Sequence, residues 1–295
     1  MFIKYLIRKR QLGDVLWVEP VIDILATKHK KVIVFTLFNE LFENYPHKNV
    51  FFKNKLNLIE KVLAKIEYYL DTTVLFINLD GAYEKKKKMH FLHAYQQKAG
   101  LPILNIYPRI FLSSEEKNMP IVKLAKYVVL HIESFSDKNY RKVYGINWKQ
   151  IVQFIKTKGF EVVQIGKCPE EIEGTQIVKT TRRQIINVIY HAQFFIGIDS
   201  GPSHIAGSLK KPSLIFFGAV NPEYRHFREL FKGYFLQQYC EFAGCYHRSS
   251  DVTEPDCKLV PNNEIPKCSL HSNKYVTENI NLLLKNFLLN NAGEN

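Results

Sequence analysis

Residues 194–222 have the residue types and spacing that suit the binding of a phosphate group. The apolar run 194–198 is followed by the turn Asp199-Ser200-Gly201-Pro202, and apolar residues at helical spacing begin just after His204. This order predicts a strand, a tight turn and a helix. Such a turn directs backbone N–H groups and the positive end of the helix dipole at one point beyond the sheet edge, where a phosphate can bind. The alternative is that Asp199 or Ser200 only caps the helix, with Pro202 in its first turn.

The second group of residues with chemical potential is a set of cysteines near the C-terminus. Cys240, Cys245, Cys257 and Cys268 are separated by four, eleven and ten residues. Four thiolates in a loop-rich segment could bind a structural zinc or iron ion. The Cys-x-x-Cys pairs usual in zinc sites are missing, so ordinary reduced cysteines remain an alternative. Either His247 or His271 could replace one cysteine, and disulfides are disfavoured in a reducing compartment.

The string DSGPSHIAGSLKKPSLIFFG resembles a known signature, D-[ST]-G-x-x-H-x-A-x-x-x-x-x-P-x-x-x-x-[FY]-G. It is that of glycosyltransferase family 9, the ADP-heptose:lipopolysaccharide heptosyltransferases. The matching residues are Asp199, Ser200, Gly201, His204, Ala206, Pro212, Phe217 and Gly218. The resemblance implies an α/β protein of the GT-B class, in which two Rossmann-like doubly wound domains face a central cleft. It also implies sugar transfer from a nucleotide donor with no cofactor required for catalysis.

The segment from Gly13 to Pro20 resembles the family's G-D-[VI]-[LV]-x-x-x-P segment. By this resemblance Asp14 is the catalytic base that accepts the proton of the acceptor hydroxyl, and Gly13 lies on the acceptor side. An inverting transfer is a single displacement at the anomeric carbon, so it needs one base and no enzyme nucleophile. The alternative is that Asp14 is only a helix N-cap.

The resemblance also assigns residues to the donor. Positive charge near the departing diphosphate is expected from the helix start at Ser200-Gly201, from His204, and from Arg141 or Lys142, of which we favour Lys142. Beside a diphosphate, Asp199 is expected to cap the turn or to accept from a donor-sugar hydroxyl. The alternatives are a solvated basic loop and a buried helix histidine.

Three further positions match the nucleotide side of the family pattern. Glu170, after the turn at Gly166, falls where an acidic residue binds the ribose hydroxyls, and Glu171 is equally suited by position. Thr180 resembles a threonine whose backbone borders the base pocket. The alternative for Glu170 is an ordinary surface residue.

The lysine run 85–88 is by default a solvated face. If it binds, Lys85 and Lys86 would face the acceptor side and attract a phosphorylated glycan or an anionic lipid surface.

The elements that must position these residues alternate along the chain. Strands are predicted over 2–7, 31–36, 74–79, 127–132, 161–165, 194–198 and 213–218. Helices are predicted over 15–27, kinked at Pro20, and over 89–99, 148–158 and 182–191. Alternating strands and helices predict parallel β-α units.

The polar stretch 113–120 approaches an interdomain linker, which predicts domains over 1–120 and 121–274, the second carrying the cysteine loop 240–268. The apolar periodicity of 275–290 predicts a helix. By the resemblance, this helix packs back on the first domain.

Composition bounds the remaining classes. The 295 residues are 46% hydrophobic and 23% charged, typical of a soluble globular protein, and the net charge of +13 favours anionic partners. The N-terminus contains no signal-peptide core and no apolar run reaches membrane-spanning length, so we expect a cytoplasmic protein, with peripheral contact at the inner face of the membrane left open. No nucleic-acid module is recognisable, and no G-x-G-x-x-G follows the first strand, which argues against an NAD-dependent oxidoreductase.

The sequence therefore predicts an inverting glycosyltransferase, with ADP-heptose as the favoured donor and lipopolysaccharide or a related anionic glycan or glycolipid as acceptor. A protein hydroxyl as acceptor and a non-catalytic nucleotide-sugar-binding or scaffold protein are the alternatives. Nucleic acid is not an expected partner.

Overall fold

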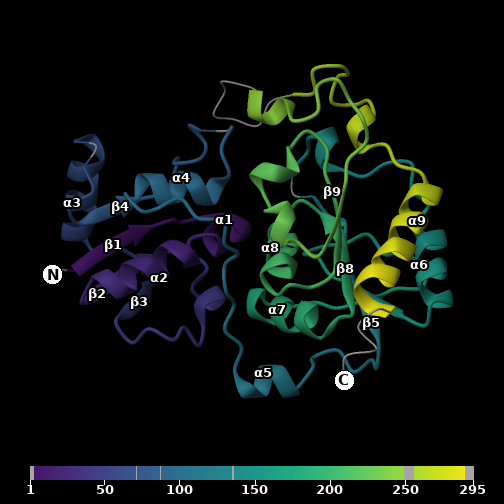
Figure 1. The fold of residues 1–295 in the computed structure, drawn as a ribbon, viewed down its shortest axis with the longest axis horizontal. Helices are drawn as coiled ribbons and strands as arrows, with labels where there is room; N and C mark the ends of the chain where they lie inside the picture. Colours follow the sequence, from purple (N-terminus) through teal and green to yellow (C-terminus); the bar gives the residue numbers. More distant parts are fainter. Residues whose placement is uncertain (1–2, 71, 87, 135, 249–255, 290–295) are drawn as a thin grey trace. The chain divides into compact units, whose positions relative to one another are not determined.

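The computed structural model describes residues 3–289, except for residues 71, 87, 135 and 249–255. The chain divides into two compact units, Met1–Ser113 and Ser114–Asn295 (Figure 1). The division falls at the start of the polar stretch 113–120. Each unit has its own parallel sheet.

Unit 1 contains a four-stranded parallel sheet in the order β3-β2-β1-β4. Its strands are β1 (Ile3–Ile7), β2 (Lys31–Phe35), β3 (Val50–Lys53) and β4 (Phe76–Asn78), and its helices are α1 (Leu12–Leu16), α2 (Glu19–Lys28), α3 (Leu58–Tyr69) and α4 (Phe91–Lys98). Strand β3 and helix α3 were not among the elements predicted from the sequence.

The single kinked helix predicted over 15–27 is wrong. The structure has two helices there, α1 and α2, with a break at Trp17 and Val18. Pro20 is in the first turn of α2, where its missing N–H has no intrahelical partner to lose. The proline therefore starts a helix and does not kink one.

Unit 2 contains a six-stranded parallel sheet in the order β10-β9-β8-β5-β6-β7. Its strands are β5 (Tyr127–His131), β6 (Glu161–Gln164), β7 (Gln176–Ile177), β8 (Phe194–Ile198), β9 (Ser213–Phe216) and β10 (Gly233–Leu236). Its helices are α5 (Ser114–Asn118), α6 (Trp148–Thr157), α7 (Arg182–His191), α8 (Gly201–Ser208) and α9 (Asn273–Leu283), the last continued by a π-helical turn over Leu284–Leu289.

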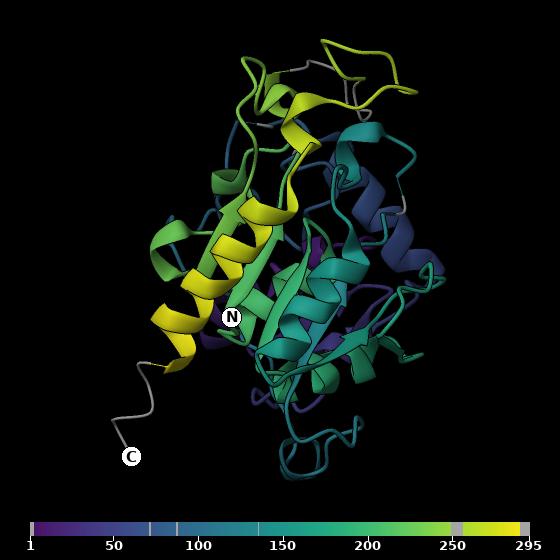
Figure 2. The same ribbon diagram turned by 90° about the vertical axis from the view of Figure 1, so that its right-hand side faces the viewer.

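Helices α7 and α8 cover one face of this sheet, and α6 and α9 lie side by side on the other (Figures 1 and 2). Counted from its own first strand, unit 2 has the strand order 3-2-1-4-5-6 of a Rossmann fold, and unit 1 has the first four positions of the same order. The predicted doubly wound α/β architecture is confirmed.

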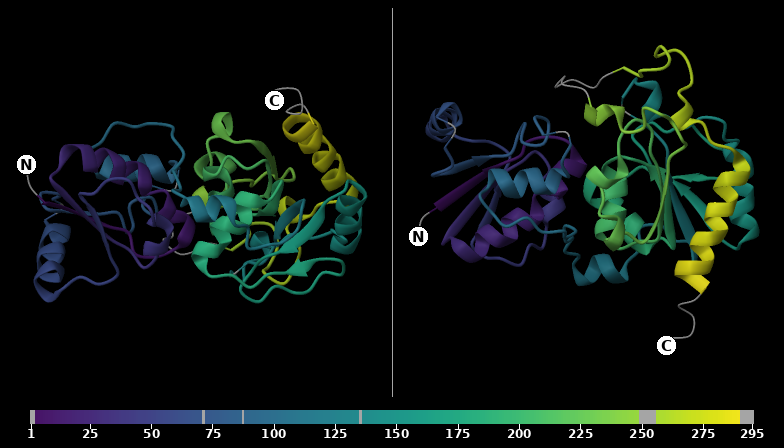
Figure 3. Two further views of the ribbon diagram at one scale, coloured as in Figure 1. Left: turned by 90° about the horizontal axis from the view of Figure 1, so that it is seen from below. Right: turned by 45° about the horizontal axis from the view of Figure 1, so that its top comes forward.

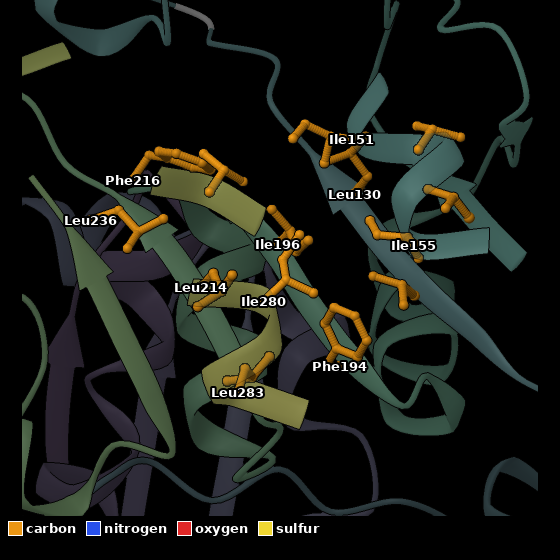
Figure 4. Packing of buried hydrophobic residues seen from close by; sticks show 14 of the residues in the cluster. Leu130, Ile151, Ile155, Phe194, Ile196, Leu214, Phe216, Leu236, Ile280 and Leu283 are labelled. Carbon is orange, nitrogen blue, oxygen red and sulfur yellow. The ribbon is translucent and has the colours of Figure 1, made fainter. Parts of the chain in front are cut away.

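The predicted C-terminal helix is present as α9, and its packing against the first domain stays a prediction. Helix α9 packs on α6, β9 and β10 of its own unit. Its side chains Val276, Ile280 and Leu283 are fully buried in one cluster with Leu214 and Phe216 of β9. Figure 4 labels Ile280 and Leu283 of the helix together with the two residues of β9. The apolar side chains of the helix are thus buried against the sheet of unit 2.

Among the described residues, we find no helix that combines the length and the apolar character needed to cross a bilayer.

The strand orders locate where ligands bind. In an open parallel sheet, the binding crevice lies outside the carboxyl ends of the strands where the strand order reverses. That point is between β1 and β4 in unit 1, and between β5 and β8 in unit 2. Asp14 follows β1 and Asp199 follows β8, so both predicted carboxylates lie at such a switch point.

Candidate functional site

Asp199 is the centre of a charged cluster in unit 2. It follows β8 directly, and its side chain is 9% exposed. Its Oδ2 atom lies 3.1 Å from Nη1 of Arg141 and 3.9 Å from Nε of Arg225. Two guanidinium groups beside one carboxylate leave a net positive charge, which suits an anionic ligand.

The aromatic ring of Tyr246 supports both arginines. The Arg141 guanidinium carbon is 5.8 Å from the ring centroid, and that of Arg225 is 5.5 Å away. Both distances are within the range of a cation–π interaction. Arg225 follows the short 3₁₀ turn Pro222–Tyr224, which Asn221 caps by accepting a hydrogen bond from the Glu223 N–H.

Gly218 allows the loop that carries Arg141 to reach Asp199. A Cβ atom at this position would lie 1.8 Å from the carbonyl oxygen of Tyr140. Only glycine permits that approach, which explains on physical grounds why a glycine ends the matched string. A pocket forms here, and its lining includes Arg141, Lys142, Asp199, Gly218 and His271.

His204 contributes no positive charge to this cluster, contrary to the prediction. The side chain is buried and stacks on His226, with ring centroids 4.6 Å apart. Burial, together with the charges of Arg225 and Arg141, lowers the pKa of His204 to about 3, and burial also holds the pKa of His226 well below its usual value. Both rings are therefore neutral near pH 7, and the cations are the arginines.

Asp199, His204 and His226 also form a group whose potential ligand atoms lie within 4.8 Å of one another. The guanidinium groups of Arg141 and Arg225 beside the same carboxylate oppose the binding of a metal cation there. This arrangement favours an anion-binding cluster over a metal centre.

Ser200, and not Asp199, is the N-cap of α8. The Ser200 N–H donates to Oγ of Ser203 at 3.1 Å, and the Ser203 hydroxyl donates to the Ser200 carbonyl at 2.7 Å. The Ser200 hydroxyl also lies 3.2 Å from Nδ1 of His131 at the end of β5. The suggestion that Asp199 caps the turn is therefore wrong, while Pro202 occupies the first turn as expected.

The turn at Gly166 is held by Glu133, a residue that the sequence did not single out. The Glu133 carboxylate accepts hydrogen bonds from the N–H groups of Lys167 (2.6 Å) and Cys168 (3.0 Å). A Cβ atom at Gly166 would lie 2.4 Å from this carboxylate. Glu170 and Glu171 are exposed, and Thr180 is half-buried. Their assignment to the nucleotide stays a prediction.

In unit 1, Asp14 lies in α1 with its side chain 15% exposed. Its Oδ2 atom accepts hydrogen bonds from Nη2 of Arg8 and from the Tyr83 hydroxyl, the latter at 3.2 Å. The N-cap of α1 is Gln11, so the interpretation of Asp14 as a cap is wrong. The carboxylate is instead fixed in direction by two donors, one directly after β1 and one in the segment after β4.

Arg8 is the main functional candidate that sequence reasoning missed. Its side chain is 4% exposed and lies between the rings of Tyr83 and Tyr95, 5.4 and 5.6 Å from their centroids. It also forms an ion pair with Glu84 at 2.9 Å. Burial alone would lower the pKa of Arg8, but Tyr95, Asp14 and Glu84 together raise it above its usual value, so the guanidinium stays charged.

The other acceptor-side candidates have ordinary surroundings. Gly13 is buried in α1, and its carbonyl accepts from the Trp17 N–H at 3.2 Å. Lys85 and Lys86 are exposed, and the Lys86 amine donates to Oε1 of Gln97 at 2.6 Å. Lys87 lies outside the described residues. A role for these side chains in acceptor binding stays a prediction.

The four cysteines of the tail are free, with Cys245 and Cys268 buried and Cys240 and Cys257 half-buried. Burial, reinforced by the charges of the three other thiols, raises the pKa of Cys268 to about 11, although a hydrogen bond with Ser269 opposes the shift. The four thiols therefore interact with one another. They do not form a compact ligand group of the kind found at Asp199.

The cysteine segment is tied to the loop that carries Arg141. Oδ1 of Asn262 accepts from the Asn139 N–H at 2.9 Å, and the Ser269 carbonyl accepts from the Tyr144 N–H at 2.9 Å. The Tyr246 N–H donates to the Ala219 carbonyl at 3.2 Å. Order in this segment thus supports the position of the 139–144 loop.

A family model matches more than half of this chain. The model of glycosyltransferase family 9 (heptosyltransferase) matches residues 50–230, which includes Asp199 and Arg225 but not Asp14. A curated relative, lipopolysaccharide heptosyltransferase 1 of Campylobacter coli, is 27% identical over 201 residues, which cover 64% of this chain and 55% of the relative. The chain thus spans about half the length of this curated relative.

Solved structures share the fold. The dodecameric iron-containing heptosyltransferase TibC in complex with ADP-D-β-D-heptose matches with a TM-score of 0.73 at 17% identity, covering 96% of this chain and 76% of TibC. A family 9 glycosyltransferase from Veillonella parvula matches with a TM-score of 0.69 at 15% identity, covering 96% and 97% of the two chains. These similarities agree with the predicted GT-B fold class.

Proposed function

We propose that this chain, which belongs to glycosyltransferase family 9, transfers a sugar from a nucleoside diphosphate donor to a glycan hydroxyl. ADP-heptose is the favoured donor and lipopolysaccharide or a related anionic glycan the favoured acceptor. The names of the curated relative and of the TibC complex support this choice. We further propose that the reaction takes place in the cytoplasm, near the inner face of the membrane.

The observation that carries the proposal is the pair of arginines on Asp199 at the start of α8. As the sugar leaves, negative charge grows on the diphosphate oxygens. Arg141, Arg225 and the N-terminus of α8 supply fixed positive charge and N–H donors for those oxygens. Lys142, which lines the same pocket, adds to this field.

Asp14 is the proposed base. It accepts the proton of the incoming hydroxyl as that oxygen attacks the anomeric carbon, and the bond to the diphosphate breaks on the opposite face, which inverts the configuration. Arg8 and Tyr83 fix the direction of the carboxylate. The reaction requires the donor held by unit 2 and the carboxylate of unit 1 to reach the same sugar.

A panel of nucleotides tests the donor. A ligand that binds only the folded protein raises its melting temperature. ADP and ADP-heptose are expected to stabilise the protein more than UDP or NAD at equal concentration. Equal stabilisation by all of them, or none, would contradict an ADP-linked donor.

We also propose that Cys240, Cys245, Cys257 and Cys268 hold a structural iron or zinc ion. The four thiols do not lie together as ligands in the structure, so an ion would have to draw them together and replace their protons. The ion would order the segment that holds the 139–144 loop. The description of TibC as iron-containing supports this proposal.

A further inference from the structure

Helix α3 turns its apolar side away from its own unit. Leu58, Ile59, Val62, Leu63, Ile66 and Tyr69 are between 40% and 76% exposed, and Leu70 and Val74, just beyond the helix, are 66% and 81% exposed. At about 100° per residue, these helical side chains fall within one arc of about 140°. Figure 3 shows α3 at the margin of unit 1, next to β4.

The inward side of the same helix is polar. Glu60 is 6% exposed, and its carboxylate accepts from the Lys53 amine at 2.7 Å and from the Asn57 N–H at 2.9 Å. The carboxylate of Glu67 accepts from the N–H groups of Leu75 (2.8 Å) and Phe76 (3.0 Å). The carboxylates of both acidic residues of α3 therefore bind groups in the rest of unit 1. The outward face of the helix carries no acidic residue.

Lysines border the exposed apolar arc on one side. Lys61 and Lys65 are exposed on one side of it, and Lys55 is exposed just before the helix. The Lys65 amine lies 5.8 Å from the centroid of the Tyr69 ring. Apolar side chains bordered by lysines and an aromatic residue, with the carboxylates removed to the other side, match the interface of an anionic bilayer.

We propose that α3 docks this protein on an anionic membrane surface, with its apolar arc in the headgroup region and Lys55, Lys61 and Lys65 against the lipid phosphates. A second copy of this chain is less suited to the same face. Face-to-face packing would bring the lysines of two helices together without a carboxylate on that face to pair with them. Docking would give the proposed transferase access to a lipid-linked acceptor. This role of the surface rests on the proposed function, whereas membrane binding itself does not.

Co-sedimentation of the full chain with vesicles tests the proposal. The protein is expected to bind phosphatidylcholine vesicles that contain phosphatidylglycerol, and to bind pure phosphatidylcholine more weakly. The double change Ile59→Ser and Ile66→Ser should lower the partition coefficient by about tenfold or more, because both side chains leave the apolar interface. Lys61→Glu with Lys65→Glu should remove the preference for the anionic lipid.

The matched control is Leu230→Ser with Ile265→Ser, which removes exposed apolar side chains of unit 2 and should leave vesicle binding unchanged. All replaced residues are on the surface, so unchanged melting temperatures should show that every variant folds. Absence of vesicle binding by the unaltered protein, or an equal loss in the control, would overturn the proposal. The proposal would also be overturned if analytical ultracentrifugation showed a stable dimer that Ile59→Ser with Ile66→Ser converts to monomer while vesicle binding persists. Nucleotide affinity, measured in parallel, reports on the proposed transferase independently.

Discussion

Replacing Gly218 by alanine tests how the fold builds the anion-binding cluster. The new Cβ would lie 1.8 Å from the Tyr140 carbonyl oxygen, whereas Cβ contacts below 3.0 Å essentially do not occur. The carbonyl must therefore retreat by at least 1.2 Å, the difference between the two values. Arg141 is the next residue, and its 3.1 Å bond to Asp199 depends on that backbone position.

The expected loss can be estimated from one interaction. A hydrogen bond to a charged group contributes about 1.5–3 kcal/mol, and about 1.4 kcal/mol corresponds to a factor of ten in affinity. If Arg141 no longer reaches the diphosphate, the Kd for ADP should rise by about ten- to hundredfold. The three atoms nearest to the new methyl group belong to Tyr140 and Ser269, neither of which is in the sheet or in α8, so the melting temperature should change little.

Isothermal titration calorimetry with ADP measures this effect in four proteins: the unaltered chain, Gly218→Ala, Arg141→Ala and the double variant. Since the glycine acts through the arginine, the double variant should bind ADP as weakly as Arg141→Ala alone. Arg228→Ala is the control, because this exposed arginine pairs with Glu223. Unchanged affinity in Gly218→Ala, or additive losses in the double variant, would refute the reasoning.

Three further predictions follow from other parts of the structure. Arg8→Lys should lower kcat by about tenfold or more without changing the Kd for ADP, because one amine cannot replace the separate N–H groups that hold Asp14 and Glu84. The control is Arg10→Lys at a nearby exposed arginine, which should change neither constant. An unchanged kcat in Arg8→Lys would contradict the positioning role. Cys268→Ser should lower the iron or zinc content measured by mass spectrometry, together with the melting temperature and the affinity for ADP. The control Cys168→Ser should change none of these three quantities. Purified protein without either metal would contradict the metal proposal. Burial lowers the pKa of His131 and His271 to about 4 and that of His204 to about 3. Below pH 6.5 these histidines therefore bind more protons in the unfolded chain, and each should lower the free energy of unfolding by up to about 1.4 kcal/mol per pH unit as the pH falls from 6.5 towards 4. Urea unfolding at a series of pH values measures this effect, and a urea midpoint that does not change over that range would contradict it.

The fold followed from periodicity where the elements are long or wholly buried. The runs 127–132 and 194–198 are apolar except for His131 and Gly197, and they contain the central strands β5 and β8. The edge strands β3, β7 and β10 were missed, since each is two to four residues long and partly exposed, which leaves no clear apolar pattern. Helix α3 was not predicted, although its apolar residues recur at helical spacing; the sequence does not show that this apolar face points outward.

The site was predictable only where its residues are neighbours in the sequence. Asp199, Ser200 and Gly201 belong to one turn, and their strand-turn-helix order located them. Arg225 joins the same cluster from 26 positions further along the chain, and Arg8 reaches Glu84 across 76 positions. No local pattern links such pairs. The one available signal for Arg8 was a basic residue at the carboxyl end of a buried strand.

The most direct test of the central claim is the turnover of Asp14→Asn with ADP-heptose and a lipopolysaccharide-core acceptor, measured beside its Kd for ADP. If Asp14 is the base, kcat should fall by about 10²-fold or more, with the Kd unchanged. Asp80→Asn is the matched control, because Asp80 also lies beside Arg8, at 3.8 Å, and should keep its activity. Full turnover in Asp14→Asn would contradict the account, and so would the absence of any transfer by the unaltered protein, which would leave a nucleotide-sugar-binding protein.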